Sequence, residues 1–151
     1  MLNLANPQTA ARWWKLPAAG VGLARMEFVV SNAIKVHPEA LLHFDKITDE
    51  SVREEIETLT AGYDDKPQYF VDQLAIGLSR IAAVAYPNPM ILRMSDFKTN
   101  EYAELIGGRK YEPNEENPMI GFRGASRYIS ESFQDCFALE CEAIKRVRNE
   151  M

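Results

Sequence analysis

Gly20-Val21-Gly22-Leu23-Ala24-Arg25-Met26-Glu27-Phe28 begins as a short apolar run and turns polar at an arginine. We interpret 21–24 as a strand, because the run is short and leads out of an Ala-Ala-Gly segment. The last residue of a strand is held by the sheet yet opens onto solvent. Arg25 is therefore predicted to present its guanidinium donors to a carboxylate or phosphate group.

Two further arginines also follow apolar, strand-like runs. Arg93 comes after Met90-Ile91-Leu92, and Arg123 comes after Met119-Ile120-Gly121-Phe122. If the three arginines converge on one mouth, they form a pocket for a small, doubly anionic ligand. The alternative is that they make ion pairs with neighbouring acids such as Glu27 and Asp96.

The pattern outside these runs predicts strands separated by helices. Strands are expected at 1–5, 21–24 and 90–94, and the third of them is expected to be buried. Helices are expected at 8–16, from 31 onward with an interruption at 37–38, at 48–62, at 67–86 and from 125 to the end. The helix at 48–62 is expected to start with the capping hydroxyl of Thr48. The helix at 67–86 carries one apolar stripe, formed by Leu74, Leu78, Ile81 and Ala85.

The segment 95–118 is long, polar and broken by glycines and prolines. It is predicted to be an extended functional loop, since structureless loops of more than about 12 to 15 residues are uncommon without a role.

The alternation of strands and helices predicts an α/β fold with a parallel sheet built from right-handed crossovers. Three strands cannot close into a barrel, so an open edge is expected beside the third strand. An exposed edge of this kind predicts self-association, swapped packing or partial disorder. Nothing in the composition divides the 151 residues into two domains.

Composition and charge exclude several classes of function. The formal net charge of -5 gives no basic surface for nucleic acid. No apolar stretch approaches the roughly 18 residues that span a bilayer, and residues 1–7 do not look like a signal peptide, so a cytoplasmic location and no membrane partner are expected. Cys136 and Cys141 lie five residues apart in one predicted helix and are expected to be reduced, packed thiols.

Three segments together resemble the phosphoenolpyruvate-utilising enzymes. Residues 20–28 resemble the family's GxGLxRxE signature, and Glu116-Asn117-Pro118-Met119-Ile120-Gly121-Phe122-Arg123-Gly124 resembles its ENPxxGxRG box. Arg93-Met94-Ser95-Asp96-Phe97-Lys98-Thr99-Asn100-Glu101-Tyr102 is similar to the second motif as it occurs in the synthase branch, whose members make phosphoenolpyruvate from pyruvate, ATP and water. Pyruvate phosphate dikinase and the first enzyme of the sugar phosphotransferase system share the first and third motifs more closely than the second.

The resemblance implies the fold and the site. It implies that residues 1–151 are part of a TIM-type (β/α) barrel that binds phosphoenolpyruvate and pyruvate at its carboxyl-end mouth, with about the first three βα units present. Arg25 and Arg93 match the substrate-binding arginines, and Arg123 matches a third, supporting arginine. No catalytic or metal-binding residue is carried over to this chain.

The resemblance also implies that the Mg²⁺ ligands lie outside the chain, and that ATP acts through an ATP-grasp domain and a phosphohistidine domain that are absent here. Phosphotransferase activity is thus expected only of the full-length protein. A stand-alone anion-binding or interaction module without turnover, or a part of a related family member, remains the alternative.

Overall fold

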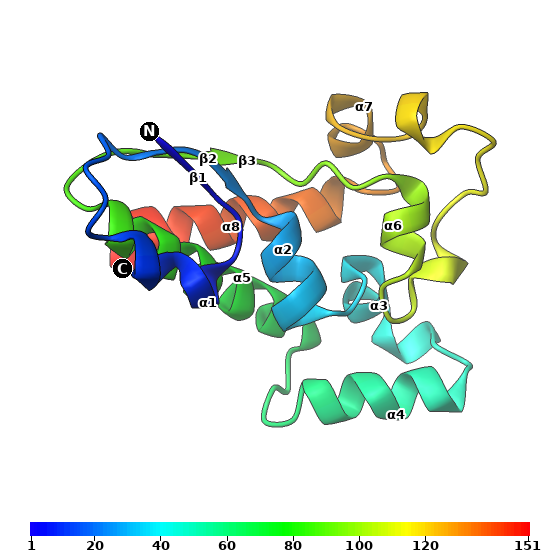
Figure 1. Ribbon diagram of the computed structural model, residues 1–151. Coiled ribbons are helices and arrows are strands. Elements are labelled where there is room, and N and C mark those ends of the chain that lie inside the picture. The colour runs from blue at the N-terminus through cyan, green and yellow to red at the C-terminus, as the bar shows by residue number, and fades with distance from the viewer.

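Three short strands form one parallel sheet in the computed structural model, which describes residues 1–151. They are β1 (Leu2–Leu4), β2 (Val21–Arg25) and β3 (Met90–Arg93), in the order β1-β2-β3. The three predicted strands and their parallel pairing are confirmed. The chain is α/β, with helical segments forming each connection between strands (Figure 1).

Helices make up most of the remaining chain. The α-helices are α1 (Pro7–Ala10), α2 (Glu27–Val29), α3 (Pro38–Leu42), α4 (Glu50–Leu59), α5 (Lys66–Ala85), α6 (Thr99–Ala103), α7 (Ala125–Tyr128) and α8 (Gln134–Glu150). A π-helical turn η2 (Val30–Ile34) continues α2, and 3₁₀ turns lie at η1 (Ala11–Trp13), η3 (Phe44–Lys46), η4 (Gly108–Lys110) and η5 (Pro118–Ile120). No helix is long and apolar enough to cross a bilayer.

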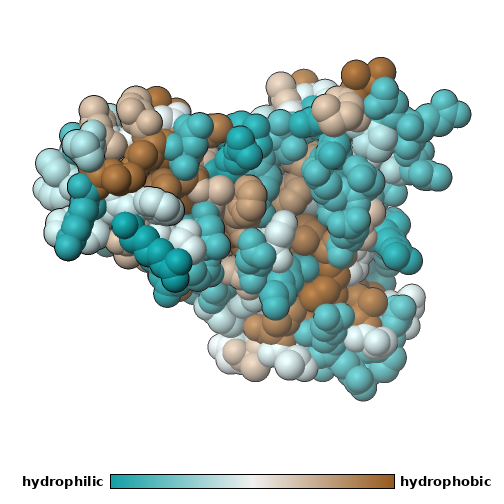
Figure 2. Space-filling model, in the orientation of Figure 1, coloured by the Kyte–Doolittle hydropathy of each residue, from teal (hydrophilic) through white to brown (hydrophobic).

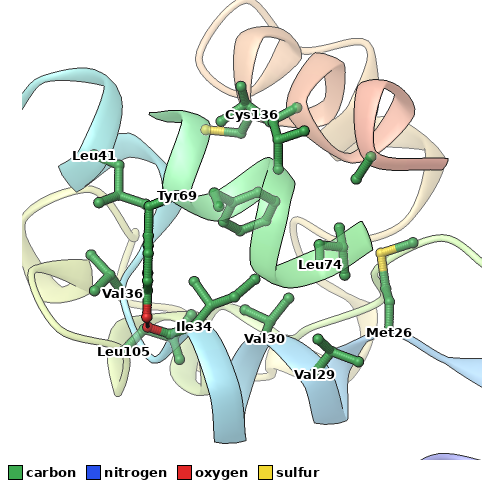
Figure 3. Packing of buried hydrophobic residues seen from close by; sticks show 14 of the residues in the cluster. Met26, Val29, Val30, Ile34, Val36, Leu41, Tyr69, Leu74, Leu105 and Cys136 are labelled. Carbon is green, nitrogen blue, oxygen red and sulfur yellow. Dashed lines mark hydrogen bonds between the residues drawn. The ribbon is translucent and has the colours of Figure 1, made fainter. Parts of the chain in front are cut away.

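The long helix α5 is the centre of the molecule. Pro67 lies in its first turn, where a missing N–H costs nothing, and its predicted apolar stripe is buried. Figure 3 shows Val29, Val30 and Ile34 packed toward Leu74 on one side of α5, with Cys136 of α8 on the other side. Helix α5 approaches α2 closely at Gly77. A Cβ added at Gly77 would lie only 2.5 Å from Cγ1 of Val29, so a larger residue does not fit at this position without a shift.

Only one face of the sheet is covered by helices. Leu4, Val21 and Ala24 pack with Ile81 and Ala85 of α5, and Figure 1 shows α1, α5 and α8 on the same side of the strands. The prediction of a buried third strand is therefore wrong: Ile91 is 55% exposed. Met90 and Leu92 pack against the core, and Ile91, which lies between them, faces the uncovered side of the sheet.

The prediction of a structureless loop over 95–118 is also wrong. This segment contains α6 and η4, and Phe97, Tyr102 and Leu105 are buried in the main core. A parallel bridge joins Val36 to Ile106 and ties the segment to the turn before α3. The segment is mostly polar, so the sequence did not indicate that three apolar side chains are enough to dock it.

Other boundaries differ as well. Met119–Phe122 is not a strand, because its first two residues belong to the 3₁₀ turn η5, so Arg123 does not stand at a strand end. The helix predicted after Gly124 is divided into α7 and α8. Helix α4 is capped by the carboxylate of Asp49, which accepts from the backbone N–H groups of Ser51 and Val52, and not by Thr48.

Both cysteines are free thiols, as expected. Cys136 is buried and donates to Glu39 Oε1 at 3.2 Å, and its burial raises the pKa of the thiol. Cys141 is exposed, because the spacing of five turns it away from the packed side of α8. Only one of the two thiols is packed.

Candidate anion-binding site

An open cleft of about 690 Å³ brings the three predicted arginines together. It lies beyond the carboxyl ends of β2 and β3, where the register places Arg25 directly beside Arg93. Neighbouring strands are about 4.8 Å apart, so the two side chains leave the sheet as a pair. Arg123 reaches the same cleft from the loop that precedes α7.

Arg93 is held by two carboxylates. Its Nη2 pairs with Glu27 Oε1, and its Nη1 lies 3.6 Å from Asp96 Oδ2. Glu27 Oε1 also accepts from the backbone N–H of Asp96 at 3.1 Å. Glu27 therefore joins the start of α2 to the segment that follows β3 and fixes the mouth of the cleft.

Arg123 forms a two-pronged ion pair with Asp96. Its Nε lies 3.0 Å from Oδ1 and its Nη2 lies 2.9 Å from Oδ2. The hydrogen bonds from Arg123 hold the pKa of Asp96 below its ordinary value. Asp96 is thus an ionised carboxylate shared between Arg123 and, at longer range, Arg93.

Arg25 differs from the other two arginines because it has no carboxylate partner and is exposed. The cleft as a whole carries four basic side chains, Arg25, Arg93, Lys98 and Arg123, matched by four acidic ones, Glu27, Asp96, Glu101 and Glu104. An anion entering this balanced cleft must therefore exchange with a carboxylate, except at Arg25, whose donors are free.

A buried polar group supports the cleft from beneath. Ser95 lies next to Asp96, donates through Oγ and N–H to the carboxylate of Glu140, and accepts a 2.6 Å hydrogen bond from Tyr128 on its carbonyl. Glu140 is 1% exposed, and this burial raises its pKa to about 7. Sequence reasoning missed Glu140, since it looks like one of several acids on an amphipathic helix.

A second buried group joins Arg127, Glu112 and His37. Arg127 is 1% exposed and donates to both oxygens of Glu112 at 2.6 Å. His37 Nδ1 accepts from the N–H of Glu39, so its Nε2 carries the proton that is donated to Glu112 at 3.1 Å. Burial lowers the pKa of His37, which keeps the ring neutral near pH 7.

The chain by itself does not fit a metal site. No group of three or more His, Cys, Asp or Glu side chains is placed to hold a metal ion. The two carboxylates that face the arginines, Glu27 and Asp96, are already engaged by guanidinium groups. Any Mg²⁺ at this cleft would need ligands from another segment or chain.

Comparisons with known proteins agree on one family. The family described as PEP-utilising enzyme, PEP-binding domain, matches residues 1–151. The chain is 55% identical over 151 residues to phosphoenolpyruvate synthase of Neisseria meningitidis, 56% identical to that of Pseudomonas aeruginosa and 53% identical to that of Escherichia coli. In each case the match covers 100% of this chain but only 19% of the relative.

The buried Glu140 predicts a pH-dependent stability difference between wild type and Glu140→Gln. Because the pKa of Glu140 is raised from 4.5 to about 7 in the folded state, the folded chain binds more protons than the unfolded chain between these values. The stability that Glu140 contributes is therefore present below about pH 4.5 and is lost as pH rises to about 7. The unfolding free energy of Glu140→Gln relative to wild type should rise by up to about 3 kcal/mol from pH 4.5 to 8.

Urea unfolding at a series of pH values measures this difference. Subtracting the two proteins removes the opposite contribution of His37, whose lowered pKa makes stability fall as pH decreases. A difference that does not change with pH would show that Glu140 titrates normally.

Proposed function

Since the family match spans residues 1–151, the chain belongs to the PEP-utilising enzymes as part of their PEP-binding domain, and we propose that it supplies the arginine side of a site for phosphoenolpyruvate and pyruvate. The observation that carries this proposal is the convergence of Arg25, Arg93 and Arg123 on one cleft. Phosphoryl transfer depends mostly on positioning and charge neutralisation, and guanidinium groups provide both without having to titrate.

The roles proposed for the arginines follow from their partners. Arg25 has free donors and takes the phosphoryl group first. Arg93 joins it by exchanging its contact with Asp96, which is already long at 3.6 Å, for ligand oxygens. Arg123 supports the site by neutralising Asp96, since its Nε and Nη2 both point to that carboxylate.

The whole-protein activity belongs to the same proposal. The relatives named phosphoenolpyruvate synthase are about five times longer than this chain, which covers 19% of them. We propose that the chain acts within an enzyme that makes phosphoenolpyruvate from pyruvate, ATP and water through a phosphohistidine on another domain. ATP and Mg²⁺ would be bound with residues outside 1–151, and the cytoplasmic location expected from the sequence is part of this proposal.

The proposed barrel rests on the topology. Three parallel strands in sequential order, with helices on one face only, are what the first βα units of a TIM-type barrel present. In that arrangement, the uncovered face would line the barrel interior, and the open edge of β3 would pair with a fourth strand.

The first prediction of the proposed function concerns Arg25. Calorimetric titration of phosphoenolpyruvate should show about 10- to 100-fold weaker binding to Arg25→Gln than to wild type, because a charge-assisted hydrogen bond contributes about 1.5–3 kcal/mol. Arg80→Gln is the matched control, since Arg80 is also exposed and unpaired but lines a different cleft. Equal affinities of wild type and Arg25→Gln would contradict the proposal.

The second prediction concerns turnover by the isolated chain. The isolated chain should bind phosphoenolpyruvate but form no AMP from ATP and pyruvate, because its residues provide neither a metal site nor the phosphohistidine domain. A coupled assay for AMP measures this directly, with a full-length phosphoenolpyruvate synthase as the positive control. AMP formation by the purified chain would refute the assignment of ATP chemistry to other domains.

The third prediction concerns self-association. The outer edge of β3 is unpaired, and a second cleft of about 950 Å³ at the opposite end of the sheet carries Trp13, Trp14 and Tyr86, which are 46%, 65% and 83% exposed. Figure 2 shows apolar surface over the end of the molecule that contains the strands. Light scattering should give a mass that rises above that of the monomer with concentration, and Ile91→Lys should reduce it, because a charge on an edge strand opposes pairing. A concentration-independent monomer with cooperative unfolding would contradict this prediction.

A further inference from the structure

Two neighbouring residues of α7 hold the backbone on both sides of the Arg123–Asp96 ion pair. Arg127 donates to the carbonyl of Phe122, the residue before Arg123, through Nε at 3.1 Å and Nη2 at 2.9 Å. Tyr128 donates to the carbonyl of Ser95, the residue before Asp96, at 2.6 Å. One short helix thus fixes two chain segments 27 residues apart whose side chains meet in the cleft.

We propose that Arg127 and Tyr128 are positioning residues that hold Arg123 on Asp96 and so keep Asp96 from competing with the ligand for Arg93. The inference rests on the proposed function only in that the ligand is a phosphate-bearing anion such as phosphoenolpyruvate. Neither residue lines the cleft, so both act through the backbone.

The guanidinium of Arg127 is held on several sides. Its guanidinium lies over the rings of Tyr102, Phe122 and Phe133 at 4.4–4.9 Å, and both oxygens of Glu112 accept from it. The peptide N–H of Phe122 is held from the other side by Glu115 Oε1 at 2.9 Å. Phe122, the residue before Arg123, is therefore hydrogen-bonded through both its N–H and its C=O. These bonds fix the backbone position from which the Arg123 side chain extends.

The Tyr128 anchor is equally well defined. Its ring stacks on Phe137 of α8, with centroids 4.5 Å apart and an interplanar angle of 12°. Burial raises its pKa to about 12, so the hydroxyl remains a donor at neutral pH. With Glu140 accepting from the N–H and Oγ of Ser95, every polar group of Ser95 is bonded. These bonds hold the backbone next to Asp96 and so direct its side chain toward Arg123.

The consequence for the ligand follows from the distances in the cleft. Arg123 occupies both oxygens of Asp96 at 3.0 and 2.9 Å, while Arg93 lies 3.6 Å away from the same carboxylate. If Arg123 is displaced, Asp96 becomes free to pair more tightly with Arg93. A ligand would then have to break that stronger ion pair before it could bind.

The test is a double-mutant cycle with phosphoenolpyruvate as the titrant. Tyr128→Phe keeps the ring stack and removes one hydroxyl, and Arg127→Lys keeps the charge but loses the two-pronged geometry. Each should weaken phosphoenolpyruvate binding about three- to tenfold in the wild-type background, as expected for one net hydrogen bond. In an Arg123→Gln background the same substitutions should have no further effect, because Asp96 is already released.

Tyr111→Phe is the matched control, since its hydroxyl is buried without a partner and lies outside the cleft. It should leave affinity unchanged in both backgrounds. Equal losses of affinity for Tyr128→Phe with and without Arg123 would overturn the positioning role, because a general loss of stability acts in both backgrounds alike.

Hydrogen exchange provides a readout that needs no ligand. Amides of 95–97 in Tyr128→Phe and of 121–124 in Arg127→Lys should exchange at least about tenfold faster than in wild type, while those of α5 keep their rates. Unchanged exchange at both segments would refute the inference even if the cleft binds phosphoenolpyruvate. Failure of wild type to bind phosphoenolpyruvate, with accelerated exchange in the variants, would refute the proposed function. The role of Arg127 and Tyr128 in positioning Arg123 and Asp96 would still be supported.

Discussion

The carboxylate of Asp96 lies between two arginines that come from distant parts of the chain. Arg93 is the last residue of β3, and Arg123 lies on a loop 30 residues later in the chain. Three guanidinium groups that converge without compensation would repel one another, and the cost at close range in a partly desolvated cleft is several kcal/mol. Asp96, aided by Glu27, removes this repulsion and so allows the arginines to share one cleft before any ligand is bound.

The rest of the structure holds this carboxylate in place. The parallel register of β2 and β3 sets Arg25 beside Arg93, and α5 supports the strands from one face. Beneath the cleft, Glu140 and Arg127 are each 1% exposed, and their polar groups are bonded to Ser95, Glu112 and Phe122. Buried charges are costly unless they are satisfied, so these bonds stabilise one arrangement of the loops over others.

The parts of the fold that follow local patterns could be predicted from the sequence. Short apolar runs bounded by Gly or Pro gave the three strands, and the stripe on α5 gave its buried face. The long-range contacts could not be predicted this way. Arg127 looks like a surface residue until Glu112, 15 residues earlier in a polar segment, is seen to pair with it. The docking of 95–118 depends on Phe97, Tyr102 and Leu105, which are too few among the polar residues of this segment to form a recognisable apolar stripe.

The central claim is that Arg25 and Arg93 bind one anion in a cleft that Arg123 supports through Asp96. The most direct measurement is nuclear magnetic resonance of the arginine side-chain Nε–H groups during a phosphoenolpyruvate titration of the chain. The signals of Arg25, Arg93 and Arg123 should shift with a common dissociation constant, while those of Arg80 and Arg146, which lie outside the cleft, should not. Shifts confined to arginines outside the cleft, or different constants for the three, would contradict the account.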